Sequence, residues 1–358
     1  MADLLDYLRL LIEWGGSDLH LKAGGAAYIR VSGDLREATD LPRLTPEDTQ
    51  SFAHAILPAS QREAFDRGIE ADFAHSVSGL GRFRVAAFRQ RGSIGLVMRR
   101  VRPGSQTLDE LDLPASVRKL AQEQRGLVLV TGPTGSGKTT TTAAMVGHIN
   151  ATRRCHIVTI EDPIEVLHSD NLAILDQREV GVDTADFDSA LRSVARQDPD
   201  VIFIGEMRDL ETVSAALQAA ETGHLVLSTL HTTDATETIN RVIDQYPPHQ
   251  QDQARISLAN SLRGIVSQRL VPRVDGGLIA VVEVLVMTLR LREFVLDADK
   301  TDQIADAIAE GEYYGMQTFD QHLIELYRSG VVSLDAALDA ATNAHDFRIA
   351  ARNVSVGL

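Results

Sequence analysis

Hydrophobic residues near the start of the chain change from a helical to an alternating spacing. Residues 4–12 place leucines and an isoleucine every three or four positions, which predicts an amphipathic helix. Shorter segments follow in which apolar and polar residues alternate between Gly-Asp and Ser-Gly turns, as in β-strands. This mixture predicts a small α+β domain over residues 1–103. Strands are expected at residues 19–21, 28–31, 71–77, 81–88 and 94–101, and a helical stretch at 46–65.

From Pro114 onward, apolar strands alternate with helical segments. The stretch Arg-Pro-Gly-Ser at 102–105 breaks the earlier pattern, so residues 104–113 are interpreted as a linker. Alternating strands and helices indicate a parallel sheet covered by helices on both faces, which predicts an α/β core at 114–287. After this core the strand patterns stop, and helical patterns predict a C-terminal helical region at 288–358.

A glycine-rich turn joins the apolar strand at 127–130 to a helix. Residues 132–139 read GPTGSGKT and match G-x-x-x-x-G-K-[ST], a loop whose backbone N–H groups surround nucleotide phosphates. Lys138 is placed to reach the β- and γ-phosphates, and Thr139 to hold Mg²⁺. A turn without a ligand is the alternative, but the flanking strand and helix favour the phosphate loop. The predicted phosphate-binding residues are Gly132, Pro133, Thr134, Gly135, Ser136, Gly137, Lys138, Thr139 and Thr140.

Carboxylates follow two other apolar strands of the predicted core. Glu161 and Asp162 end the strand at 157–160, and Glu206 stands just beyond the strand at 201–204. Ligands of open α/β sheets bind at the carboxyl ends of the strands, so these acids are expected beside the γ-phosphate. There they can order Mg²⁺ and polarise the attacking water. The alternative is that they are solvent-facing loop residues.

Two histidines bracket a further apolar strand. His224 precedes it and His231 follows it, seven positions later. An odd spacing on a strand directs the two rings to opposite faces, which argues against a shared metal site. On spacing alone, each is more typical of a half-buried structural histidine than of a catalytic residue, and a polar sensor beside the phosphate is the alternative.

Arginines gather on the strands of the first domain. Arg82 and Arg84 share one face of a strand, Arg89 and Arg91 lie at the following turn, and Arg99 lies near the end of the next strand. A solvated strand face is the simplest interpretation. The core itself offers no obvious arginine for the γ-phosphate, however, and hydrolysis gains when a guanidinium arrives from a second domain or subunit.

Charge and composition narrow the function classes. The 358 residues carry 35 Lys and Arg against 50 Asp and Glu, a net charge of −15, which argues against direct nucleic-acid binding. The single cysteine, Cys155, excludes a zinc site built from several cysteines and is interpreted as a core residue. The longest apolar stretch, at 278–287, contains Glu283 and is too short to cross a bilayer. Without a signal region at the N-terminus, the protein is expected in the cytoplasm.

Together these motifs resemble the PilT group of type IV pilus retraction motors, within the secretion ATPase superfamily. The resemblance extends along almost the whole chain. Its four main blocks are GPTGSGKT at 132–139, IEDPIE at 160–165, DPDVIFIGEMRD at 198–209 and TGHLVLSTLHT at 222–232, with further matches at 18–20, 82–85 and 315–318.

The resemblance implies a PAS-like N-terminal domain followed by a RecA-like P-loop ATPase core with C-terminal helices. It implies a ring-shaped homohexamer that binds ATP and Mg²⁺. Glu206 would be the catalytic carboxylate, and Glu161 with Asp162 would support water and metal, so that Thr139, Glu161 and Glu206 form the metal set. His224 and His231 would lie on the phosphate side. Arg84, Arg91 and Arg99 would contact phosphate from the neighbouring domain.

The implied role is filament retraction from the inner face of the cell membrane, through an inner-membrane platform protein and with a retraction-ATPase paralogue as a further partner. The extension branch usually carries a four-cysteine zinc insert that this chain lacks. The chain departs from the family at its AIRNLI motif, where residues 290–295 read RLREFV and Glu293 replaces asparagine. Its end, around 344–348, is similar to the accessory PilU type. Pilus assembly, type II secretion and a nucleotide-gated regulatory module remain alternatives.

Overall fold

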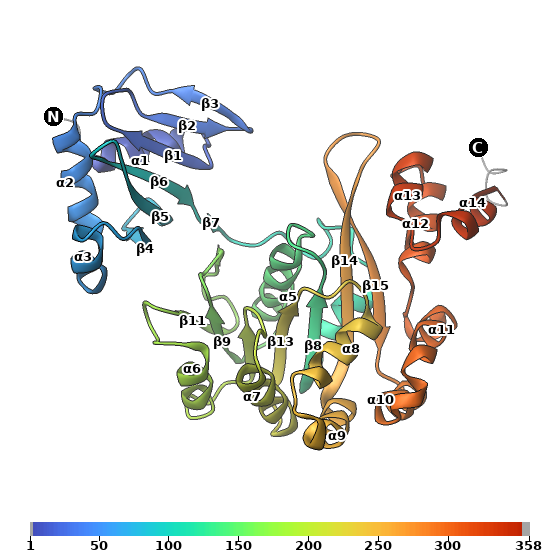
Figure 1. The fold of residues 1–358 in the computed structure, drawn as a ribbon. Helices are drawn as coiled ribbons and strands as arrows, with labels where there is room; N and C mark the ends of the chain where they lie inside the picture. The colour runs from blue at the N-terminus through green and yellow to red at the C-terminus, as the bar shows by residue number, and fades with distance from the viewer. Residues whose placement is uncertain (1–2, 353–358) are drawn as a thin grey trace. The chain divides into compact units, whose positions relative to one another are not determined.

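The computed structural model describes residues 3–352, and the chain forms two compact units (Figure 1). The first unit contains the chain up to Pro103 together with Glu165–Leu167, and the second contains Gly104–Ile164 and the chain from His168 onward. Within residues 3–352, no helix combines the length and the apolar character needed to cross a membrane.

The first unit is built on a six-stranded antiparallel sheet in the order β3-β2-β1-β6-β5-β4. Alternate residues of β5 (Gly81–Gln90), such as Phe83 and Val85, are buried under the helices. Helix α1 begins at a capping box formed by Asp3 and Asp6, and it buries Tyr7 and Leu8. The remaining elements are β1 (Asp18–Lys22), β2 (Tyr28–Val31), β3 (Asp34–Glu37), β4 (Ala71–Val77), β6 (Ser93–Arg100), α1 (Leu4–Glu13), α2 (Pro46–Ile56) and α3 (Ala59–Asp66).

The strands of this unit lie close to the predicted ranges, with two differences. Strand β3 was not predicted, because all four of its residues are exposed and no alternation marks it. The expected helical stretch at 46–65 is two helices, because Leu57 is extended and Pro58 cannot donate the next helical hydrogen bond. A short parallel ladder between β7 (Arg102–Pro103) and β10 (Val166–Leu167) explains why residues 165–167 belong to this unit.

The second unit is built on a seven-stranded sheet in the order β11-β9-β12-β13-β8-β14-β15. Its strands are parallel except β15, which pairs antiparallel with β14, so the predicted α/β fold class is confirmed. The strands are β8 (Gly126–Thr131), β9 (His156–Glu161), β11 (Ile174–Glu179), β12 (Val201–Ile204), β13 (Leu225–Leu230), β14 (Leu262–Pro272) and β15 (Leu278–Val286).

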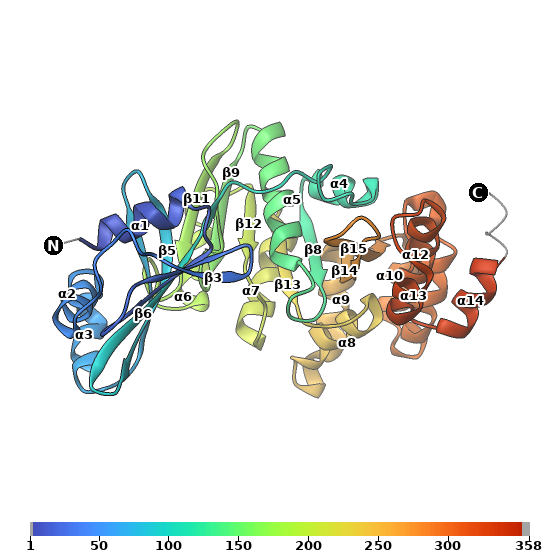
Figure 2. The same cartoon turned by 90° about the horizontal axis from the view of Figure 1, so that it is seen from above.

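Helices cover both faces of this sheet, as Figure 2 shows for α4 and α5 on one side and α7, α8 and α9 on the other. Strand β8 is apolar from Leu127 to Val130 because Leu127 and Leu129 pack into one core and Val128 and Val130 into the other. Cys155 packs at the margin of the α5 side and is half-buried. The helices to this point are α4 (Ala115–Ala121), α5 (Lys138–Thr152), α6 (Phe187–Val194), α7 (Leu210–Glu221), α8 (Ala235–Asp244), the 3₁₀ turn η1 (Pro248–Gln250) and α9 (Gln251–Ser261).

From β15 to Arg352 the chain is helical, as predicted, and residues 353–358 of the predicted helical region lie outside the described residues. One part packs on the core beside α9, and the last three helices pack with the far ends of β14 and β15 through residues such as Val281, Phe319 and Phe347. These elements are α10 (Leu289–Leu296), η2 (Ala298–Gln303), α11 (Ile304–Ala309), η3 (Glu312–Tyr314), α12 (Phe319–Arg328), α13 (Leu334–Ala340) and α14 (Ala344–Arg352).

Candidate functional site

The phosphate loop lies between the end of β8 and the start of α5. Gly132, Gly135 and Gly137 have φ values of 144°, 82° and 88°, a region that other residues rarely adopt. A Cβ at Gly132 would also lie 2.4 Å from the carbonyl oxygen of Gln268. Helix α5 begins at Lys138, so its positive end and its first unpaired N–H groups border the loop.

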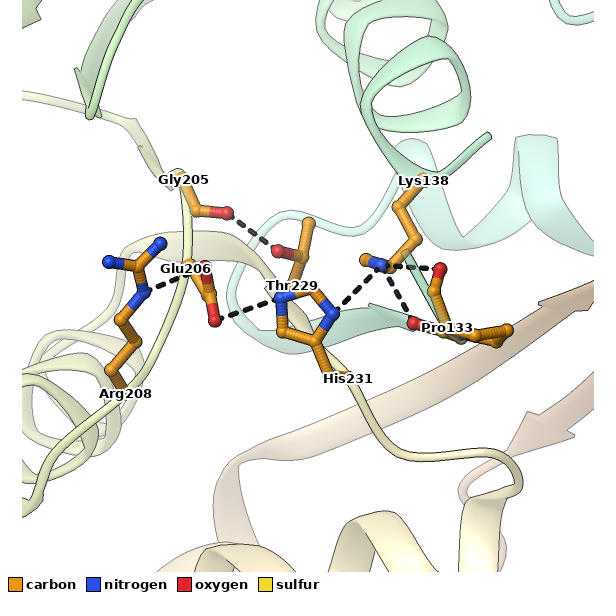
Figure 3. A network of polar contacts seen from close by, with 8 residues as sticks. Pro133, Lys138, Gly205, Glu206, Arg208, Thr229 and His231 are labelled. Atoms are coloured by element: carbon orange, nitrogen blue, oxygen red, sulfur yellow. Dashed lines mark hydrogen bonds and ion pairs between the residues drawn. The ribbon is translucent and has the colours of Figure 1, made fainter. Parts of the chain in front are cut away.

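Lys138 is 9% exposed and extends back over the loop. Its Nζ donates hydrogen bonds to the carbonyl oxygens of Gly132 (2.7 Å) and Pro133 (3.0 Å), and it lies 3.4 Å from Nδ1 of His231 (Figure 3). An ammonium held by carbonyl oxygens and a ring nitrogen is already arranged for phosphate oxygens, which are better acceptors.

His231 connects the loop to the carboxylate on the next strand but one. Its Nε2 lies 3.0 Å from Oε1 of Glu206, and Nε of Arg208 lies 2.9 Å from the other oxygen of that carboxylate (Figure 3). The sheet order explains the contact, because β8, β13 and β12 are neighbours and their carboxyl ends meet at one edge. Thr229 fixes the strand ends by donating to the Gly205 carbonyl oxygen at 2.6 Å.

Glu161 and Asp162 lie at the same edge of the sheet but farther from the loop. Glu161 ends β9, which is separated from β8 by β12 and β13, roughly 14 Å at ordinary strand spacing. Its side chain is buried, and Oε1 accepts hydrogen bonds from the Thr159 hydroxyl (2.7 Å) and the Gln177 amide (3.1 Å). Asp162 is exposed. Both acids therefore lie closer to Glu206 than to Lys138.

His224 does not lie with the other candidates, so grouping it with them is wrong for a single chain. Strands β13 and β8 pair in parallel from Leu225 opposite Gly126 to Leu230 opposite Thr131. His224, just before β13, therefore lies level with the first residue of β8, and its Nδ1 is 2.9 Å from the carbonyl oxygen of Ala219. His231 lies at the other end of β13, beside the loop. The length of β13 separates the two rings.

The candidate arginines belong to the first unit. The register of β5 and β6 places Arg84 directly opposite Arg99, and Arg91 occupies the turn between these strands with a φ of 48°. Arg84 lies 4.0 Å from Glu165, and Nε of Arg99 lies 2.8 Å from the buried carboxylate of Asp18. Burial tends to raise the pKa of Asp18, but the Ser17 hydroxyl and the Arg99 guanidinium outweigh it and hold that pKa below its usual value.

The rest of the loop fits a phosphate group. Pro133 and Thr134 are exposed at its tip, Thr139 is half-buried, and Thr140 is exposed at the start of α5. Ser136 Oγ is buried without a hydrogen-bond partner among the described residues, so a ligand oxygen could satisfy it. Among these same residues, no group of three or more His, Cys, Asp or Glu side chains is arranged to hold a metal ion. Mg²⁺ is usually held by one or two protein groups together with substrate phosphates and water, and the half-buried Thr139 at the start of α5 is such a group beside the loop.

Two residues that contact the site received no role from the sequence. Arg208 was visible in the block at 198–209 and lies two positions after Glu206, which could have suggested their contact. Gln268 comes from β14 and carries no local signal, because its partners are more than 120 positions earlier in the chain.

Comparisons with known proteins show which family the chain resembles. A family model described as "Type II/IV secretion system protein" matches residues 79–277. The chain is 43% identical over 345 residues to the type IV pilus retractation ATPase PilT of Pseudomonas aeruginosa, covering 96% of this chain and 100% of the relative. It is also 43% identical over 343 residues to the type IV pilus ATPase PilU of the same organism, covering 96% and 89%. The solved structure titled "Crystal Structure of the Pilus Retraction Motor PilT and Bound ADP" matches with a TM-score of 0.89 at 43% identity, covering 97% of this chain and 99% of that one.

Proposed function

The chain belongs to the PilT family of type IV pilus retraction ATPases, as its motifs predicted, and from this we propose that it hydrolyses ATP to retract a pilus for twitching motility. One observation supports the proposal most strongly. The lysine of the phosphate loop and the carboxylate after β12 lie at one sheet edge, joined through a single histidine. This is the pair of groups that phosphoryl transfer to water requires.

Binding of ATP would use the loop and the start of α5. The loop N–H groups and the positive end of α5 would surround the β-phosphate, and Lys138 would exchange the carbonyl oxygens of Gly132 and Pro133 for phosphate oxygens. The lysine would then leave His231, so that nucleotide binding would change the contacts of His231 and Glu206. ADP, the nucleotide bound in the matching PilT structure, would use the same groups.

Hydrolysis would depend on Glu206. This carboxylate is 20% exposed on its side chain, which leaves room for water, and Arg208 and His231 fix its orientation. It would orient and polarise the attacking water. Thr139, Glu206 and, through water, Glu161 would hold Mg²⁺, which would neutralise the developing charge on the phosphate oxygens.

A guanidinium from another subunit would complete this site. We propose a homohexameric ring in which Arg84, Arg91 and Arg99 approach the phosphate of a neighbouring site. Arg84 and Arg99 face each other across β5 and β6, which supports the proposal for this pair, whereas Arg91 lies at the turn, roughly 20 Å farther along the hairpin.

The expected location is the cytoplasmic side of the inner membrane. There the ring would act on an inner-membrane pilus platform protein, with a retraction-ATPase paralogue as a further partner and without direct contact to nucleic acid. The equal identity to PilT and PilU supports placing the chain in this two-ATPase system.

The Glu206→Gln variant tests the proposal. The substitution keeps the shape of the side chain but removes its charge, so ATP binding should persist while turnover falls by roughly a hundredfold or more. Lys138→Ala should instead impair nucleotide binding. Turnover measured on purified proteins, with binding followed by a fluorescent ADP analogue, separates the two. Near wild-type hydrolysis by Glu206→Gln would remove Glu206 from this role.

A further inference from the structure

Gln268 lies on β14 beneath the phosphate loop and connects the loop to α5. It is 2% exposed. Its Oε1 accepts a hydrogen bond from the Thr141 hydroxyl (2.8 Å), and its Nε2 donates one to the Ser136 carbonyl oxygen (2.7 Å). The strand register leads to this position, because Ser267 pairs with Thr131 and the next residue of β14 therefore comes beside Gly132.

The glycines of the loop show how closely it packs on this residue. A Cβ at Gly132 would lie 2.4 Å from the Gln268 carbonyl oxygen, and a Cβ at Gly137 would lie 2.7 Å from Gln268 Nε2. Both distances are shorter than any ordinary contact. Gln268 therefore borders the loop at its first and last glycine.

The bond to Ser136 also sets the direction of a neighbouring donor. In a trans peptide the carbonyl and the following N–H point in opposite directions. Because Gln268 holds the Ser136 carbonyl on the β14 side, the N–H of Gly137 is directed away from β14, toward the interior of the loop. That is the direction in which a phosphate oxygen would be bound.

We propose that Gln268 is a positioning residue that preforms the phosphate loop for nucleotide binding. Its two hydrogen bonds hold the Ser136–Gly137 peptide against the first turn of α5, so the loop enters the complex without reorganising. This inference rests on the nucleotide site proposed above. Gln268 would contribute to nucleotide affinity without touching the nucleotide, because its hydrogen bonds are to the loop and to α5.

The test compares variants that remove one or both arms of this bridge. Gln268→Leu removes both, Thr141→Val removes the helix arm, and Thr141→Ser restores the hydroxyl. Asn150→Leu is a matched control, because Asn150 is another buried amide on α5 that donates to the Ser169 carbonyl oxygen (2.8 Å) and accepts from the Asn171 N–H (3.1 Å). It lies roughly 18 Å along the helix from Lys138. The measured quantities are the Kd for Mg-ADP, KM and kcat for Mg-ATP, and Tm without nucleotide.

We expect Gln268→Leu to weaken ADP binding about tenfold and to raise KM more than it lowers kcat. Thr141→Val should weaken binding about threefold, and Thr141→Ser should stay within a factor of about two of wild type. Asn150→Leu should lower Tm without changing the Kd.

The proposal is overturned if Gln268→Leu lowers Tm as Asn150→Leu does and leaves the Kd unchanged. Should Gln268→Leu not fold, equal affinities of Thr141→Val and Thr141→Ser would overturn it instead. A wild-type protein without affinity for nucleotide would overturn the proposed function, and this inference with it. If the wild-type protein binds nucleotide and the Gln268 and Thr141 variants have the same Kd, the role of Gln268 is overturned and the proposed function is not.

Discussion

Glu283 is a buried carboxylate on β15 whose charge state changes near neutral pH. It is 8% exposed and accepts a hydrogen bond from the Ala235 N–H (2.9 Å) at the start of α8. Burial raises its pKa to about 7, against the lowering effect of that hydrogen bond. Asp234 and Asp320 raise the pKa further, while Arg269 opposes them.

The raised pKa predicts a pH dependence of stability. Between about pH 4.5 and 7 the folded protein binds this proton more tightly than the unfolded chain, so stability should fall as pH rises through that window. Glu283→Gln keeps the acceptor for Ala235 without the charge. As the pH rises from 5 to 8, the free energy of unfolding of this variant should therefore increase relative to that of wild type, by on the order of 3 kcal/mol at most. Thermal unfolding at several pH values measures this, and parallel Tm profiles of the two proteins would contradict it.

Residues of the site were predictable where a motif fixes their spacing. Lys138 and Glu206 follow apolar strands in recognisable blocks, and parallel strands bring their ends to one edge. His231 could not be chosen over His224 from spacing alone, since only the pairing of β13 with β8 shows which ring reaches the loop. Gln268 could not be predicted, because its contact depends on β14 lying beside β8.

At the scale of elements, α10 carries the segment in which the chain departs from its family. Leu291, Phe294 and Val295 are buried. Arg292 is exposed, and its Nη2 donates to Oδ1 of Asn260 on α9 (2.6 Å). The arginine therefore joins two surface helices and does not complete the core.

Arg292→Ala should separate hydrolysis from mechanical work. The phosphate loop and its carboxylates are elsewhere, so ATP turnover and Tm should stay within a factor of about two and a few degrees of wild type. Pilus retraction in cells should be lost if this arginine transmits force.

Asn260→Ala is the matched control for Arg292→Ala. It removes only the acceptor of the Arg292 hydrogen bond. Equal loss of pilus retraction in both variants would assign the role to the bridge between α9 and α10. Loss of retraction in Arg292→Ala alone would assign the role to the exposed guanidinium. Joint loss of hydrolysis and stability in Arg292→Ala would show that the segment belongs to the ATPase fold.

Buried strands were easier to predict from the sequence than exposed strands. Central strands such as β8 and β12 are continuous apolar runs and were found from the sequence, whereas β3 and β11 were not. β3 and β11 are each at the edge of a sheet, and the four exposed residues of β3 carry no alternation that would mark a strand. The helical stretch at 46–65 was identified, but its division at Pro58 was not.

At the scale of the whole molecule, the guanidinium proposed to come from a neighbouring subunit predicts that activity depends on assembly. If a neighbouring subunit supplies the guanidinium, specific activity should rise with protein concentration and then level off. Addition of Glu206→Gln subunits should lower the specific activity by more than the fraction of inactive subunits in the mixture. Activity assays across a dilution series, with sedimentation on the same samples, measure both. Full activity from a monomer would contradict the shared site.

The central claim is that ATP hydrolysis at Lys138 and Glu206 retracts a pilus, and imaging of labelled pili tests it most directly. Cells in which Glu206→Gln replaces the wild-type chain at the same protein level should extend pili and fail to retract them. Retraction at the wild-type frequency and speed, by cells whose only copy of this protein does not hydrolyse ATP, would contradict the claim.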